Sequence, residues 1–235
     1  MRKMSIESVD QLLDSAYKAA INGIPGTLSA EELAEEYLNK SNSKMKAVDD
    51  LVKWQIAKCG TSGFISGLGG IITIPIGLPA NIVSVIYIQI RMIAAIAYIG
   101  GYNIKDDKVK SLVYLCLCGN SAKDIAKAAG IQFGTKFSKA MIEKIPGHVI
   151  IKINQKVGFR FLTKFGEKGV VNIGKMIPLA GGIIGLGFDT ASTKIISKMA
   201  KSTFIYDDMS TSVKKCDWKM GRTYDKFLLE NQIPR

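Results

Sequence analysis

The chain has 235 residues, of which 47% are hydrophobic, and its formal net charge is +12 at pH 7. That length favours one large domain, and that apolar content argues against an intrinsically disordered chain. Residues 1–50 carry six Lys/Arg and nine Asp/Glu, a net charge of −3, so the remaining residues carry +15. A basic region beside apolar segments suits an anionic membrane surface. No nucleic acid is expected as a partner, because no nucleic-acid-binding motif accompanies the charge.

The residue types on which most catalytic and metal sites depend are scarce. His148 is the only histidine, and it follows a Pro-Gly pair as turn residues do. Cys116 and Cys118 are two residues apart, which is not a zinc-site spacing, so we expect reduced, buried thiols. Glycine motifs for phosphate or dinucleotide binding are absent at the required spacing. We therefore expect no catalytic, cofactor-binding or metal-binding residues, and a protein that is not an enzyme.

Helical periodicity covers most of the chain. The segments that carry it are residues 6–21, a short helix after the capping box at Ser29, and residues 44–59, 108–117, 122–129, part of 130–145, 149–165 and 190–204. We predict an all-α fold of about 8–10 helices, a multi-helix bundle around a glycine- and proline-lined apolar helical hairpin. The helical domain is expected over residues 1–204, followed by a polar tail over 205–235.

Residues 60–101 form the most apolar stretch of the chain. Residues 59–90 contain no charge, and 13 more uncharged residues follow Arg91. Residues 80–98 contain neither Gly nor Pro and are dominated by Ile, Val and Ala. A helix that starts after Pro79 is therefore predicted.

This predicted helix has two interpretations. About 21 helical residues span roughly 31 Å, close to the hydrocarbon thickness of a bilayer. A central arginine costs about 3 kcal/mol on insertion, which offsets most of the apolar gain. Four polar residues also fall on one narrow stripe that needs a partner in a bundle or a wet cavity, namely Ser84, Tyr87, Arg91 and Tyr98. The helix is either the buried core of a soluble α-bundle or one arm of a hairpin that enters or docks on a membrane.

A second apolar segment, residues 174–189, is of the same kind as the first. Both segments contain prolines at helix starts and pairs of glycines four residues apart, which let helices approach closely. The residues expected to serve membrane contact or helix packing are Gly63, Gly67, Gly70, Pro75, Pro79, Pro178, Gly181 and Gly185.

Arg91 and Asp189 are charged residues inside these two apolar segments. An isolated charge in such surroundings is costly, so each needs a partner. Our hypothesis is that the two form a buried charge pair that joins the segments. The alternative is that each side chain reaches water separately.

Basic residues recur at four-residue steps along the helix predicted over 149–165. They are Lys152, Lys156, Arg160 and Lys164, and we place them opposite the apolar residues Val149, Ile153, Val157 and Phe161. This stripe is either a solvated helix face or a contact for an anionic membrane surface or an acidic partner.

Seven pieces of the chain, taken in order, carry a family resemblance. They are residues 26–37, 51–55, 63–70, 74–79, 96–102, 153–160 and 177–185. Their order and spacing over about residues 22–204 resemble the bacterial EcsC family. The resemblance implies a helical, membrane-linked protein, and it implies no reaction. Because the family is named after a protein encoded beside an ABC-type exporter, a link to ABC-type export is a further candidate.

We therefore expect a non-enzymatic, membrane-associated helical protein that docks on or inserts into the cytoplasmic face of the inner membrane. Residues 60–101, residues 174–190 and the basic stripe would make the contact. The expected partners are anionic membrane lipids, and a membrane transporter or a second copy of the chain are further candidates. One alternative is a pore-forming or membrane-perturbing effector that releases a buried hydrophobic hairpin. The other is a soluble scaffold, or an enzyme with an unrecognised site.

Overall fold

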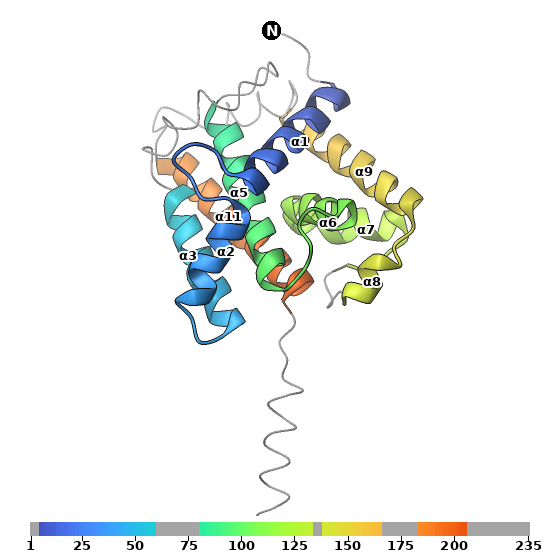
Figure 1. Ribbon diagram of the computed structural model, residues 1–235. Helices are drawn as coiled ribbons and strands as arrows, with labels where there is room; N and C mark the ends of the chain where they lie inside the picture. The colour runs from blue at the N-terminus through green and yellow to red at the C-terminus, as the bar shows by residue number, and fades with distance from the viewer. Residues whose placement is uncertain (1–4, 60–79, 134–137, 166–182, 206–235) are drawn as a thin grey trace, which may run out of the picture. The chain divides into compact units, whose positions relative to one another are not determined.

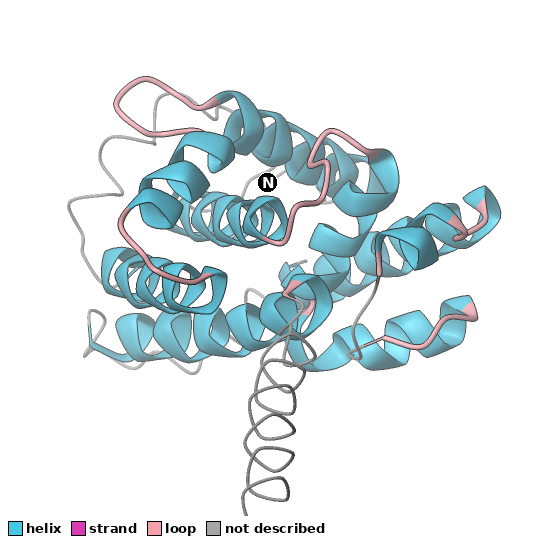
Figure 2. Ribbon diagram, turned by 60° about the horizontal axis from the view of Figure 1, so that its bottom comes forward, coloured by secondary structure: helices cyan, strands magenta, loops and turns pink. Residues whose placement is uncertain are grey.

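The computed structural model describes residues 5–59, 80–133, 138–165 and 183–205, and over these ranges the chain is helical, with no strand (Figure 2). The described helices are α1 (Ile6–Asn22), α2 (Ala30–Asn39), α3 (Lys44–Cys59), α5 (Ala80–Ile99), α6 (Asp107–Leu117), the 3-10 helix η1 (Gly119–Ser121), α7 (Ala122–Ala129), α8 (Lys139–Glu143), α9 (Gly147–Phe165) and α11 (Ile183–Phe204). The predicted all-α multi-helix fold is confirmed. The first arm of the predicted hairpin, residues 60–79, and the tail from residue 206 lie outside the described residues.

Side-chain caps begin several of these helices. At α2 the Ser29 Oγ accepts a hydrogen bond from the Glu32 backbone N–H at 3.1 Å, and the Glu32 carboxylate accepts one from the Ser29 N–H at 2.8 Å. This confirms the predicted capping box, which satisfies two backbone donors that a helix start leaves open. At α6 the Asp106 carboxylate accepts from the Lys108 N–H at 2.7 Å.

The prediction that part of residues 130–145 is helical is confirmed, and the helix is α8. α7 ends at Gly130, which takes the left-handed conformation with φ +94°, and residues 131–133 are not helical. Glycine adopts this conformation without steric cost and so terminates helices. In the described part of the segment, helix is confined to the five residues of α8, which Ser138 caps by accepting from the Met141 N–H at 3.3 Å.

α5 is the central helix of the described core. It packs against α1, α2, α3, α6 and α11 (Figure 1), and every residue from Ile86 to Ala97 is buried. By length and composition the segment Ile82–Ile99 could cross a membrane, yet most of it is buried inside the protein. In this structure α5 therefore acts as a core helix.

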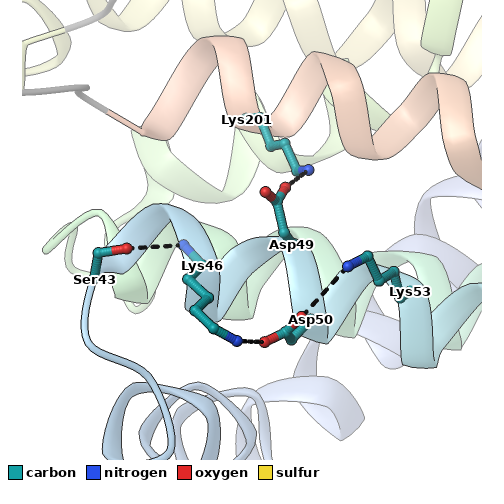
Figure 3. Close-up of polar contacts among 6 residues, drawn as sticks. All are labelled: Ser43, Lys46, Asp49, Asp50, Lys53 and Lys201. Atoms are coloured by element: carbon teal, nitrogen blue, oxygen red, sulfur yellow. Dashed lines mark hydrogen bonds and ion pairs between the residues drawn. The ribbon is translucent and has the colours of Figure 1, made fainter.

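Polar contacts tie the helices around α5 together. The Gln89 side chain of α5 donates to the Thr193 hydroxyl of α11 at 3.0 Å, and both residues are buried. Lys201 of α11 forms an ion pair with Asp49 of α3, while the next residue, Asp50, pairs with Lys46 within α3 (Figure 3). Buried polar groups need such partners, so the Gln89–Thr193 hydrogen bond fixes α11 against α5, and the partly exposed Lys201–Asp49 ion pair adds a contact with α3.

Candidate functional site

α9 is an amphipathic helix with one side in the core. Its buried apolar residues are Val149, Ile153, Val157 and Phe161, and the helix packs against α1, α6 and α7. This side follows from the four-residue spacing of large apolar residues, which places them along one face.

The basic stripe of α9 lies beside the buried stripe, so the expectation that the two lie opposite is corrected. At 100° per residue, stripes offset by three residues are separated by only about 60°. Accordingly Lys152 and Arg160 are exposed, whereas Lys156 and Lys164 are half-buried.

The side of α9 that faces directly away from the core carries two large apolar residues. Ile151 and Phe159 are each 59% exposed, and they flank the exposed Gln155. We call the set Ile151, Lys152, Lys156, Phe159 and Arg160 the outer face of α9. The sequence interpretation overlooked Ile151 and Phe159, although their eight-residue spacing places them within about 80° of each other on the helix.

The charged residues of the outer face are all basic. α9 contains no acidic residue. Within the described ranges, no ion pair involves Lys152, Lys156 or Arg160. The two exposed apolar side chains and the three cations therefore form adjacent strips that together span about half of the helix circumference, with Phe159 next to Lys152.

The apolar part of this surface continues onto α1. Ile6 is 43% exposed, and a Cβ added to Gly158 of α9 would lie 3.6 Å from its Cγ2. A Cβ at Gly158 would also lie 2.9 Å from an Asp10 carboxylate oxygen, so the glycine allows α1 to approach α9 closely, and both Ile6 and Asp10 border the outer face.

The polar stripe of α5 finds its partners inside the bundle. Arg91 is 2% exposed, and its guanidinium donates to the Leu28 carbonyl at 3.1 Å and to the Gln55 Oε1 at 3.4 Å. Its Cζ lies 5.3 Å from the centroid of the Tyr87 ring, within the range of a cation–π contact. The Asp189 side chain lies outside the described residues, so the Arg91–Asp189 pair stays a hypothesis.

Tyr98 stands at the end of the same stripe. Its hydroxyl lies 3.1 Å from a carboxylate oxygen of Glu31 and 3.1 Å from one of Glu35, and it can donate to either. The hydrogen bond to Glu35, then burial and the bond to Glu31, raise the pKa of Tyr98 to about 12. These contacts attach the C-terminal end of α5 to α2.

Most of the predicted glycine and proline positions fall outside the described residues. This applies to Gly63, Gly67, Gly70, Pro75, Pro79, Pro178 and Gly181. Gly185 lies in α11.

The described cysteines are ordinary core thiols. Cys116 is buried and Cys118 is half-buried, and both are free. Burial raises the pKa of each thiol to about 12, so the reactive thiolate form is disfavoured in both. Among the described residues, no group of three or more His, Cys, Asp and Glu side chains could hold a metal ion.

A family model described as the EcsC protein family matches residues 2–206. The matched range includes α1 as well as the pieces between residues 22 and 204 that carried the resemblance in sequence. No curated protein and no solved structure matches the chain.

Proposed function

The chain belongs to the EcsC protein family, and from this premise we propose that it is a non-enzymatic peripheral protein that docks on an anionic membrane surface, at the cytoplasmic face of the inner membrane. The outer face of α9 makes the contact. The observation that carries the proposal is the presence of Ile151 and Phe159, each 59% exposed, beside three cations that form no ion pair within the described residues.

The cations and the exposed apolar side chains of the outer face supply different parts of the binding free energy. A cation near an anionic bilayer contributes about 1 kcal/mol, so Lys152, Lys156 and Arg160 contribute about 3 kcal/mol. Full burial of an Ile or Phe side chain contributes about 1.5–3 kcal/mol. Stable attachment generally takes two such signals, and here both stand on one rigid helix.

Docking by α9 leaves the core intact, whereas insertion of α5 would not. To face lipid, α5 would have to leave five neighbouring helices and separate Arg91 from the Leu28 carbonyl and Gln55. The surface mode is therefore the one that the folded bundle supports, and insertion or pore formation would require the bundle to open.

The test is flotation of the purified full chain with vesicles. We expect binding to vesicles that contain phosphatidylglycerol, little binding to phosphatidylcholine vesicles, and loss of binding at high salt. Lys152→Glu and Arg160→Glu should each weaken binding at least fivefold, because about 1 kcal/mol per removed cation is a factor of about five. Phe159→Gln should weaken binding at low salt without changing its salt dependence, because it removes apolar contact and no charge.

Matched control variants lie on other exposed surfaces. Lys123→Glu and Lys127→Glu on α7, and Met141→Gln on α8, change exposed residues of the same types. They should bind as the unmodified chain does, apart from the general effect of net charge. Equal binding by the α9 and control variants would refute docking by this face. Release of an entrapped dye, or resistance to carbonate extraction, would indicate membrane perturbation or insertion instead.

A further inference from the structure

His148, the only histidine of the chain, lies in the first turn of α9. The sequence indicated a turn residue after Pro146 and Gly147, but α9 begins at Gly147, so His148 is the second residue of the helix. His148 is exposed, and no ion pair within the described ranges involves it. Its imidazole is therefore accessible to solvent and to a surface that approaches α9.

His148 is in register with the outer face of α9. Residues three and four positions apart are neighbours on a helix surface, so His148 adjoins both Ile151 and Lys152. At 100° per residue, its angular position falls between those two residues. His148 thus extends the four-residue series of Lys152, Lys156 and Arg160 by one turn toward the N-terminus of α9. A membrane that contacts Ile151 and Lys152 also meets His148.

The imidazole can add a cation to this surface. Histidine is the side-chain type whose charge ordinarily changes between about pH 5 and pH 8, when a ring nitrogen takes up a proton from the solution. A cation close to an anionic bilayer strengthens attachment, and the negative surface potential of the bilayer in turn favours the protonated form. The outer face would then combine three permanent cations with one cation that depends on pH.

Most other titratable groups around α9 change charge outside this pH range. The helix packs against α1, α6 and α7, and α8 directly precedes it. The charged residues of these four helices are Glu7, Asp10, Asp14 and Lys18 of α1, Asp107, Lys108 and Lys110 of α6, Lys123, Asp124 and Lys127 of α7, and Lys139, Glu143 and Lys144 of α8. Carboxyl groups ordinarily titrate near about pH 4 and lysines near about pH 10. Asp10 needs a control, because partial burial raises the pKa of its carboxyl group.

We propose that protonation of His148 regulates docking, so that the protein attaches to an anionic membrane more tightly as the pH falls from about 7.5 to about 5.5. This inference rests on the proposed docking by the outer face of α9 and adds a control of that same surface. One additional cation corresponds to about fivefold tighter binding.

The experiment is flotation of the full chain with phosphatidylglycerol vesicles at about pH 5.5, 6.5 and 7.5 and constant ionic strength. The unmodified chain should bind about fivefold more tightly at the lowest pH than at the highest. His148→Gln should keep the weaker affinity throughout, because its side chain stays neutral. His148→Lys carries a permanent cation, so it should bind at every pH as the unmodified chain does at the lowest pH.

Relocating the histidine tests whether its place on α9 matters. In the His148→Gln background, Gln155→His places an imidazole two turns further along the outer face, within about 20° of the original position, and should restore the pH dependence. Asn39→His in the same background places it at an exposed position of α2 and should not. Asp10→Asn in the unmodified chain should leave the pH dependence in place.

Two results would overturn the proposal and leave the docking itself standing. They are equal affinity of the unmodified chain at the lowest and highest pH, and an unchanged pH dependence in His148→Gln. If Asp10→Asn rather than His148→Gln abolished the pH dependence, the effect would belong to Asp10. Absence of binding to phosphatidylglycerol vesicles at every pH would refute docking by the outer face and this regulation with it.

Discussion

α5 and α9 are helices of similar length, 20 and 19 residues, and the sequence connects both with membranes. The structure separates them. α5 is surrounded by five helices and buried from Ile86 to Ala97, whereas α9 buries one side and leaves Ile151 and Phe159 on the other. The more apolar helix, α5, is thus the one that is buried in the core.

The polar residues of α5 and α9 explain why α5 is buried and α9 is partly exposed. Arg91 and Gln89 of α5 find hydrogen-bond partners in other parts of the protein, at Leu28, Gln55 and Thr193. The cations on the outer face of α9 form no ion pair within the described residues. Hydrophobicity alone therefore identifies core as readily as membrane contact, and the partners of the charged residues distinguish the two.

The largest contrast is expected between two arginines. Arg91→Ala should lower the free energy of unfolding by about 3–5 kcal/mol, because it removes a fully buried side chain and leaves its hydrogen-bond acceptors unpaired. Arg160→Ala, on the outer face of α9, should change it by at most about 0.5 kcal/mol. Urea denaturation of both variants measures the difference.

The same experiment extends to Asp189. If Asp189 pairs with Arg91, Asp189→Ala should destabilise the protein strongly, and the double variant should lose less than the sum of the two single losses. Additive losses would exclude the pair and leave Leu28, Gln55 and Tyr87 as the described contacts of Arg91.

A pair of isoleucines gives the next contrast. Ile96 is fully buried in α5, so Ile96→Ala should cost about 2–4 kcal/mol through lost burial and the cavity that remains. Ile151→Ala on α9 makes the same chemical change at a side chain that is 59% exposed and should cost at most about 0.5 kcal/mol. Similar losses at the two positions would mean that α9 buries its outer face against another part of the chain.

Much of this architecture was predictable because it depends on local sequence. The capping box at Ser29, the bounds of α3 and α7, and the polar stripe of α5 follow from periodicity and capping rules. The bounds of α8 were less predictable, because the pattern indicated only that part of residues 130–145 is helical.

The partners across helices were not predictable in the same way. The stripe on α5 indicated that Arg91 needs a partner, but only the packing shows that Gln55 of α3 provides one contact. A surface pocket is lined by Asp10, Tyr114 and Asn154, which come from three helices far apart in the chain. One signal was available, because Asn154 is a polar residue on the buried side of α9, between Ile153 and Val157.

A smaller stability contrast is expected between two glycines. A Cβ on Gly100, directly after α5, would lie 2.2 Å from the Phe204 carbonyl oxygen, so Gly100→Ala should displace α11 and cost about 2 kcal/mol. A Cβ on Gly147, at the first position of α9, would meet no atom within 4 Å, so Gly147→Ala should be neutral or stabilise by about 0.5 kcal/mol. Thermal denaturation of both variants provides the comparison.

The smallest effect is expected where α5 approaches the surface, at Tyr98. Its folded-state pKa of about 12 lies above the value near 10 of an unfolded tyrosine, so folding favours the neutral phenol. The resulting stabilisation is fully present below about pH 10 and is lost as the pH rises through about 12.

The difference in phenolate absorbance between the unmodified chain and Tyr98→Phe isolates the titration of Tyr98. Glu35→Gln should lower the pKa of Tyr98, because it weakens the principal hydrogen bond of the hydroxyl. Glu143→Gln on α8 serves as the control. Titration of Tyr98 near pH 10 in the folded protein would show that its hydrogen bonds to Glu31 and Glu35 of α2 are absent in solution.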